Sequence, residues 1–225
     1  MTTQQQAKEQ AALRSLGYVR DGMIVGLGTG STASLAIRYL GELVADGLKV
    51  HGVPTSEASA RLARDLGIPL LDLNEVPCVD VTIDGADEIG PGLALIKGGG
   101  GALLREKLVA VQSREVIIIA DSSKEVDTLG RFPLPVEVVP FAWRRVERDL
   151  EELGLAPALR AVDGQAFLTD QHNMILDCHA RRIEDPPATA ARIKALPGVV
   201  EHGLFLQVAS RAIVAGPHGI VERMS

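Results

Sequence analysis

Acidic side chains follow an apolar segment near the middle of the chain. Asp84, Asp87 and Glu88 come directly after residues 79–83, which have the apolar character of a buried strand. Ligands of parallel sheets bind beyond the carboxyl ends of the strands, so carboxylates at this point are positioned for ligand binding or catalysis. A solvated acidic turn is the alternative, and three acids immediately after a buried strand fit it less well.

A lysine and four consecutive glycines come next along the chain. Lys97 precedes Gly98–Gly101, and Glu106 falls in the first turns of a helix that the pattern predicts over residues 102–111. Glycine loses much conformational freedom on folding, so such a run is expected where the backbone lies against a ligand. Glu106 taken alone would also fit a solvated helix face.

A segment rich in glycine and hydroxyl groups, GLGTGSTA over residues 26–33, follows one predicted strand and opens a predicted helix. Its glycines let the backbone turn tightly, and the free amides of a helix N-terminus favour an anion. The hydroxyls of Thr29, Ser31 and Thr32 add donors for phosphate or sugar oxygens. A dinucleotide-binding fold would need an acid at the end of the second strand, where this sequence has PTS over residues 54–56. The segment favours a phosphorylated small molecule over NAD, with a plain strand–helix turn as the alternative.

The elements that must position these residues alternate between strands and helices. Strands are predicted over residues 23–27, 49–53, 79–83 and 115–120, and helices over residues 3–19, 32–46, 56–66 and 102–111. This order is typical of an α/β fold in which helices cover both faces of a parallel sheet. The last of these strands is followed by ADSSK (120–124), which brings Lys124 to the same edge of the sheet.

A different rhythm begins after Gly130. Strands are predicted over residues 136–139, 166–168 and 174–177, and helices over residues 143–153 and from Asp185 to just before Pro197. This order indicates a second, smaller α+β domain. The strand-like runs of residues 204–220 are placed to rejoin the first sheet.

Composition excludes several classes of protein. With 46% hydrophobic and 23% charged residues the chain has an ordinary globular composition, and its net charge of -6 disfavours nonspecific nucleic-acid binding. The two cysteines, Cys78 and Cys178, lack the spacing of a disulfide framework or a zinc site. Residues 1–6 lack the pattern of a signal peptide, and no uncharged apolar run approaches membrane-spanning length. A cytoplasmic protein without a membrane segment is expected.

Taken together, these segments resemble the A-type ribose-5-phosphate isomerases. The matching stretches are GLGTGSTA (26–33), TSEAS (55–59), DGADEI (84–89), KGGGGALLREK (97–107), ADSSK (120–124), GRFPLPVEV (130–138), NMILD (173–177) and PGVVEHGLF (197–205). They run nearly the whole length of the chain in the family's order. The combination of DGADEI with KGGG and REK is highly specific, and Gly101 stands where the family is expected to have a small residue.

The resemblance implies an enzyme that interconverts D-ribose 5-phosphate and D-ribulose 5-phosphate in the pentose phosphate pathway, without a metal or other cofactor. It implies a Rossmann-like domain, here residues 1–130 plus 206–225, interrupted by a small ferredoxin-like α+β domain, here residues 131–205. It also suggests a homodimer or homotetramer. No nucleic-acid or membrane partner is expected, and the only partner that the resemblance implies outside the oligomer is the sugar phosphate.

The resemblance also implies roles for particular residues. Glu106 would be the catalytic base, Lys97 would stabilise the enediolate oxygen, and one of Asp84 and Asp87 would assist opening of the sugar ring. Substrate contacts would come from Thr29, Gly30, Ser31, Thr32, Asp84, Gly85, Ala86, Asp87, Lys97, Gly98, Gly99, Gly100 and Lys124. Lys8 matches a lysine that can reach phosphate, although this match is weaker. The groups that hold the phosphate stay open.

Two functions of other classes remain as alternatives. A nucleotide-dependent oxidoreductase could use the glycine segment for pyrophosphate, but the acid that would hold its ribose is missing. A non-catalytic sugar-phosphate sensor would usually carry a DNA-binding segment, for which an acidic chain of 225 residues has no spare length. Sugar-phosphate deaminases and acyl-CoA transferases of similar fold match the motifs less well.

Overall fold

The computed structural model describes residues 3–225, and the chain forms two compact units. Met1 and Thr2, the start of the segment examined for a signal peptide, lie outside the described residues. The first unit contains the chain up to Ala86, Arg105–Lys124 and Gln207–Ser225, and the second contains Asp87–Leu104 and Glu125–Leu206. Residues 87–104 thus group with the second unit rather than with the larger predicted domain, because their short strands pair with a strand near residue 204.

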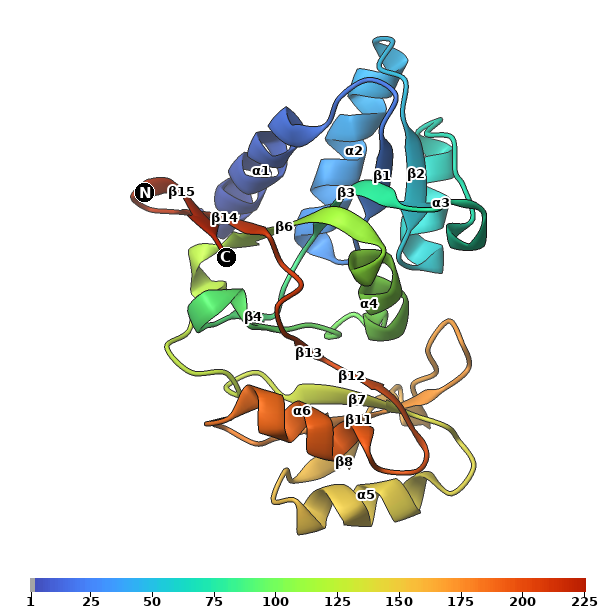
Figure 1. Ribbon diagram of the computed structural model, residues 1–225, viewed down its shortest axis with the longest axis vertical. Helices are drawn as coiled ribbons and strands as arrows, with labels where there is room; N and C mark the ends of the chain where they lie inside the picture. The colour runs from blue at the N-terminus through green and yellow to red at the C-terminus, as the bar shows by residue number, and fades with distance from the viewer. Residues whose placement is uncertain (1–2) are drawn as a thin grey trace. The chain divides into compact units, whose positions relative to one another are not determined.

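The first unit is built on a six-stranded sheet with the order β15-β14-β6-β3-β1-β2 (Figure 1). Its strands are β1 (Ile24–Leu27), β2 (His51–Pro54), β3 (Val79–Asp84), β6 (Ser113–Asp121), β14 (Arg211–Gly216) and β15 (Gly219–Met224). All neighbouring pairs are parallel except β14 with β15, which form an antiparallel pair. The predicted α/β fold is confirmed. Of the strand-like runs predicted over residues 204–220, those from Arg211 onward return to the first sheet, whereas Leu204 and Phe205 pair with residues 95–96 in a separate small sheet.

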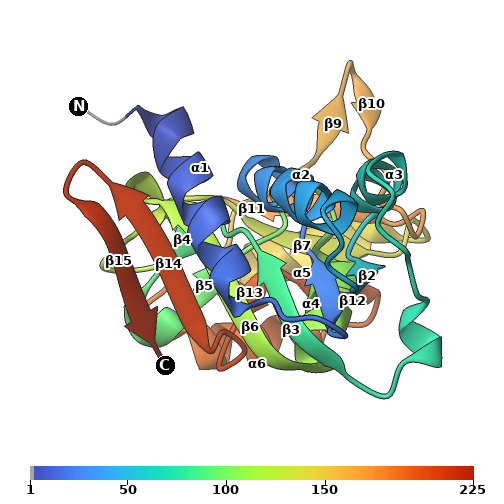
Figure 2. The same ribbon diagram turned by 90° about the horizontal axis from the view of Figure 1, so that it is seen from above.

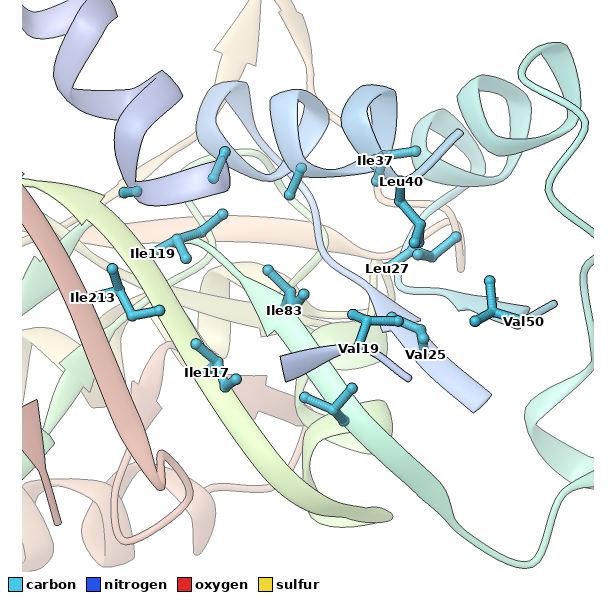
Figure 3. Close-up of a cluster of buried hydrophobic side chains, with 14 of the residues drawn as sticks. Val19, Val25, Leu27, Ile37, Leu40, Val50, Ile83, Ile117, Ile119 and Ile213 are labelled. Atoms are coloured by element: carbon cyan, nitrogen blue, oxygen red, sulfur yellow. The ribbon is translucent and has the colours of Figure 1, made fainter. Parts of the chain in front are cut away.

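Helices cover both faces of this sheet, as expected for strands that are apolar on both sides. They are α1 (Gln4–Ser15), α2 (Ser31–Ala45), α3 (Glu57–Asp65) and α4 (Leu103–Val111), with short 3-10 turns at η1 (Leu16–Tyr18), η2 (Leu73–Glu75) and η4 (Ser122–Lys124). Figure 2 shows α1 and α2 lying over the strands. Their apolar side chains, among them Ile37 and Leu40, pack on Leu27, Ile83 and Ile119 (Figure 3). Val109 of α4 belongs to a separate buried cluster with β2 and β3.

The second unit contains a four-stranded antiparallel sheet with the order β12-β7-β11-β8. Its strands are β7 (Leu134–Val138), β8 (Pro157–Leu159), β11 (Met174–Cys178) and β12 (Val199–His202). Helices α5 (Trp143–Glu152) and α6 (Pro186–Lys194) pack on one face, where alternate residues of β7 join the core: Leu134, Val136 and Val138. The intervening Pro135 and Glu137 therefore lie on the other face.

Two smaller sheets complete the second unit. The pieces β4 (Glu88–Ile89), β5 (Leu95–Ile96) and β13 (Leu204–Phe205) form one of them, with 3-10 turn η3 (Pro91–Leu93) between the first two. The strands β9 (Ala161–Val162) and β10 (Gln165–Ala166) form a hairpin. The strand predicted over residues 166–168 overlaps β10 only at Ala166, and β10 pairs with β9. The strand predicted over residues 174–177 is β11, which pairs with β7 and β8.

Candidate active site

The predicted site residues are divided between the two units. The first unit carries Thr29, Gly30, Ser31, Thr32, Asp84, Gly85, Ala86, Glu106 and Lys124, and the second carries Asp87, Lys97, Gly98, Gly99 and Gly100. The chain passes from the first unit to the second between Ala86 and Asp87, inside the acidic motif.

In the first unit, the glycine segment and the first aspartate of the acidic motif are in direct contact. Asp84 ends β3 and is 2% exposed, and its Oδ1 accepts hydrogen bonds from the amides of Thr29 at 3.0 Å and Gly85 at 2.7 Å. A β-carbon on Gly28 would stand 2.3 Å from that same Oδ1. Gly28 is therefore required for the loop after β1 to approach the end of β3.

The N-terminus of α2 is open to an anion. Its cap is Gly30, with φ 108°, and this residue provides no side-chain capping bond. Lys8, on α1, donates from Nζ to the Ser31 hydroxyl at 3.0 Å, so a cation lies beside the first turn of α2. The positive end of the helix dipole and the ammonium group both favour a bound phosphate. The weaker sequence match at Lys8 thus has a clear spatial counterpart.

The hydroxyl of Thr29 is used within the protein. It donates to Ser56 Oγ at 2.8 Å and lies 2.8 Å from Thr55 Oγ1 and 3.2 Å from Ser59 Oγ. The Ser59 hydroxyl in turn donates to the carbonyl of Gly28 at 2.6 Å. These bonds explain why TSEAS accompanies the glycine segment: its hydroxyls anchor the loop between β1 and α2.

Two further predicted residues of the first unit lie in the elements just before and just after β6 along the chain. Glu106 lies in the first turn of α4 and is 4% exposed. Lys124 ends η4, which follows β6, and β6 runs parallel to β3 with Ile118 opposite Asp84. Since parallel strands end at one edge of a sheet, Lys124 lies at the edge where β3 delivers Asp84.

Asp121, at the end of β6, was not among the predicted site residues. Burial acts to raise the pKa of its carboxyl, but hydrogen bonds from Ser123 and Gln4 and the charge of Lys8 outweigh burial and leave that pKa below its usual value. Asp121 therefore stays ionised and attracts Lys8 toward this edge. Asp121 belongs to the ADSSK segment that was assigned to the site for its lysine. The segment alone does not show that its aspartate also has a role.

In the second unit, Lys97 follows β5 and is 3% exposed. Its amide donates to the carbonyl of Gly203 at 2.9 Å, and its Nζ lies 5.5 Å from the centre of the Phe205 ring. Gly203 cannot carry a side chain, since a β-carbon there would stand 2.3 Å from the carbonyl oxygen of Lys97. The PGVVEHGLF motif therefore supports the lysine through this close backbone contact.

The glycine run of the second unit binds the second aspartate of the acidic motif. The amide of Gly99 donates to Asp87 Oδ2 at 2.8 Å, and a β-carbon on Gly99 would stand 2.6 Å from Asp87 Oδ1. Gly98 and Gly101 have φ values of 102° and 82°, which favour glycine. Glycine is therefore needed in this run for two reasons: positive φ values at Gly98 and Gly101, and the close approach of Gly99 to the Asp87 carboxylate.

Among residues 3–225, no group of three or more His, Cys, Asp or Glu side chains is arranged to hold a metal ion. None of the helices in that same range is long and apolar enough to cross a membrane. The described thiols Cys78 and Cys178 are not joined in a disulfide, and burial, with the charge of Asp177, raises the pKa of Cys178 to about 12.

The chain is similar to known proteins over nearly its whole length. The family description Ribose 5-phosphate isomerase A (phosphoriboisomerase A) matches residues 51–219. A curated relative, ribose-5-phosphate isomerase A of Bradyrhizobium diazoefficiens, is 54% identical over 97% of this chain and 96% of its own. A solved D-ribose-5-phosphate isomerase in complex with phospho-erythronic acid superimposes with a TM-score of 0.96 at 36% identity, covering 99% of this chain and all of the other. Ribose 5-phosphate isomerase A from Methanocaldococcus jannaschii gives 0.94 at 40% identity, over 99% and 100% of the two chains.

An α/β sheet with these matches defines an enzyme of the sugar-phosphate aldose–ketose isomerase class. The chain belongs to the ribose-5-phosphate isomerase A family. It interconverts D-ribose 5-phosphate and D-ribulose 5-phosphate, a step of the pentose phosphate pathway.

Proposed function

We propose that the isomerisation proceeds through an enediolate, with Glu106 moving the proton between C2 and C1 and Lys97 stabilising the oxygen that gains charge. The observation that carries this assignment is burial: Glu106 is 4% exposed and Lys97 is 3% exposed. Lys and Glu side chains are almost never fully buried unless they are paired, so each of these two is held in place by its contacts. In a site that excludes water, a fixed ammonium group stabilises developing negative charge far better than it would in solution.

Asp84 and Asp87 bind sugar hydroxyls in this proposal, and one of them assists opening of the furanose ring. Both are supported by backbone amides: Asp84 by Thr29 and Gly85, and Asp87 by Gly99. Amide donors fix the direction in which a carboxylate points. Each carboxylate can therefore accept a hydrogen bond from a sugar hydroxyl without changing its orientation. Gly85 and Ala86, between them, contribute backbone contacts to the sugar.

The phosphate binds at the N-terminus of α2, through the amides after Gly30, the Ser31 and Thr32 hydroxyls and Lys8. The uncapped helix end and the lysine beside it support this placement. The solved relative is in complex with phospho-erythronic acid, a ligand that also carries a phosphate group. Lys124, at the same edge of the sheet, adds positive charge, and Gly98 to Gly100 supply backbone contacts to the sugar.

The active form is a homodimer or homotetramer in the cytoplasm. It works without a redox cofactor because the reaction exchanges no electrons with an acceptor, and the resemblance to the family implies that it needs no metal. The resemblance of the whole chain to its family supports the oligomer. Light scattering coupled to gel filtration tests it directly: a mass of one chain at working concentration contradicts this part of the proposal.

The decisive test of the mechanism is Glu106→Gln, which keeps the size of the side chain and removes the base. Turnover of ribose 5-phosphate falls by at least about 10²-fold, because general base catalysis contributes roughly 10²–10⁴-fold. The rise in melting temperature on adding ribose 5-phosphate stays, because the binding groups are untouched. Substantial turnover by this variant excludes Glu106 as the base.

The matched control is Glu42→Gln, on the exposed side of α2, which keeps full activity.

The same assay in excess EDTA tests the absence of a metal. Ketose formation at an unchanged rate supports it, and a rate that is lost with EDTA and restored by a divalent cation contradicts it.

A further inference from the structure

Arg160 holds the glycine run through two carbonyl groups. Its Nη1 donates to the carbonyl oxygen of Gly98 at 2.9 Å and to that of Gly99 at 3.1 Å. The same guanidinium binds both oxygens of Asp177, with Nε at 2.8 Å and Nη2 at 2.5 Å. All three nitrogens of one planar group are therefore used, two on a carboxylate and one on the backbone of the predicted site.

The pair is built to keep one orientation. Asp177 lies on β11, paired with β7 on one side and β8 on the other, and the side chains of Arg160 and Asp177 are 13% and 21% exposed. The main chain of Arg160 is bound as well, because its amide donates to Ile175 and its carbonyl accepts from Phe167, both at 2.9 Å. A bidentate arginine–carboxylate pair fixes the plane of the guanidinium, so the direction of Nη1 is fixed too.

This fixed direction determines where the amides of the glycine run point. In a planar trans peptide, the carbonyl of one residue and the amide of the next point in opposite directions. Since Gly98 O faces Arg160, the Gly99 amide faces away from it, and it meets Asp87 Oδ2 at 2.8 Å. Since Gly99 O also faces Arg160, the Gly100 amide likewise points away.

The Gly100 amide has no protein acceptor within residues 3–225, and Gly100 is exposed. Glycine peptides rotate easily because no β-carbon restricts them. The carbonyl of Gly98 also accepts from the amide of Gly101 at 3.0 Å. Without Arg160, the peptide that follows Gly99 would be free to flip, and the peptide that follows Gly98 would keep only the bond from Gly101, so the support of Asp87 would weaken.

We propose that Arg160, held by Asp177, is a positioning residue for the isomerase reaction. It orients two peptide planes of the glycine run so that the Gly99 amide holds Asp87 and the Gly100 amide is presented to a sugar oxygen. This inference rests on the proposed roles of Asp87 and Gly100. Arg160 does not touch the substrate, and it acts through the loop alone.

The test is the kinetics of Arg160→Gln with ribose 5-phosphate. A misplacement of about 1 Å in a catalytic constellation can cost on the order of 10²-fold in rate. We expect kcat to fall by about 10-fold to 10²-fold. KM should stay within about threefold of wild type, because the groups of the first unit that are proposed to bind the phosphate are unchanged. Arg182→Gln is the matched control, since Arg182 is in the same unit and pairs with Glu184 at the surface, 65% and 72% exposed. It keeps the wild-type kcat.

A double-mutant cycle separates positioning from stability. Asp87→Ala removes the group that Arg160 is proposed to position, so adding Arg160→Gln to it costs far less kcat than Arg160→Gln costs alone. Independent losses that multiply, or a kcat of folded Arg160→Gln within about twofold of wild type, overturn the inference. If Arg160→Gln does not fold, Arg160→Lys and Asp177→Asn replace it, and each lowers kcat in the same direction because neither can form the complete bidentate clamp.

Glu106→Gln in the same assay distinguishes the two levels of the argument. An active Glu106→Gln contradicts the proposed catalytic base and leaves the Arg160 cycle interpretable. An inactive Glu106→Gln beside a fully active Arg160→Gln contradicts only the positioning role.

Discussion

A β-carbon on Gly28 would stand 2.6 Å from the Cα of Asp84, so the two residues approach each other as closely as a glycine permits. This contact joins the loop after β1 to the end of β3. It places the Thr29 amide on Asp84 Oδ1 at 3.0 Å. The glycine and the aspartate are therefore held together, although 56 positions separate them along the chain.

Gly28→Ala should reduce both stability and activity. The added methyl group forces the loop away from Asp84, and overpacking of this kind typically costs about 1–3 kcal/mol. We expect kcat/KM to fall by on the order of 10²-fold, because Asp84 and the α2 N-terminus shift together. Thermal unfolding and steady-state kinetics measure the two effects. Gly17→Ala is the control, since a β-carbon there would meet only Arg14 at 3.7 Å, and wild-type behaviour of Gly28→Ala would contradict the close contact.

Lys8→Gln should weaken substrate binding more than it slows the chemical step. Lys8 is bonded to Ser31 at the first turn of α2, where the phosphate is proposed to lie. Loss of one charge-assisted contact at a solvated site corresponds to a KM increase of about tenfold, with kcat changed much less. The control is Lys49→Gln, an exposed lysine just before β2, where the parallel strands begin. A kcat loss without a KM change would place Lys8 in the chemistry instead.

Glu137→Gln should remove a pH dependence of stability. Glu137 is fully buried on β7, and its Oε1 accepts from Thr169 Oγ1 and Asn173 Nδ2, both at 2.9 Å. Burial raises the pKa of its carboxyl; those two bonds oppose the rise, and the charges of Glu201 and Asp170 add to it. A raised pKa means that the folded state binds the proton more tightly than the unfolded state does. This contribution to stability is fully present below the usual carboxyl pKa and is lost as pH rises through the folded pKa.

The measurement is the melting temperature of wild type and Glu137→Gln between about pH 4 and about pH 8. Glutamine keeps the Oε1 acceptor and carries no charge, so the variant should gain stability relative to wild type as pH rises. Glu151→Gln, an exposed change on α5 of the same unit, should show no such trend. A difference between Glu137→Gln and wild type that stays constant across the range would contradict a raised pKa.

Gly101→Ala should disturb the hairpin of the second unit. A β-carbon at Gly101 would stand 2.4 Å from Cζ of Phe167, and the backbone there has φ 82°. The ring can move, but the left-handed backbone still costs a non-glycine residue about 1 kcal/mol. We expect Gly101→Ala to melt at a lower temperature, and Phe167→Ala to restore part of the loss in the double variant. A double variant no more stable than the sum of the two single changes would exclude the steric cause.

The long elements around the site could be predicted because each has its own periodic signal. The apolar strand before Asp84 and the helix that begins at Ser31 are both present, with boundaries shifted by one or two residues. The short strands β4, β5, β9 and β13 could not be predicted, since two residues carry no period. Pairing among three of them, β4, β5 and β13, groups residues 87–104 with the second unit.

The sequence by itself determined the chemistry available to this protein: carboxylates after β3, a lysine before a glycine run, and hydroxyls at a helix start. These are local patterns, which can be recognised from residues that are close together in the sequence. Only the tertiary structure decided which distant groups support them. The bond from Arg160 to Gly98 joins residues 62 positions apart, and it exists because pairing of β11 with β8 holds Asp177 beside Arg160. The stretch from Asp84 to Gly99 contains the acids, the lysine and part of the glycine run, but contacts made by Gly28, Gly203 and Arg160 determine how its backbone is held.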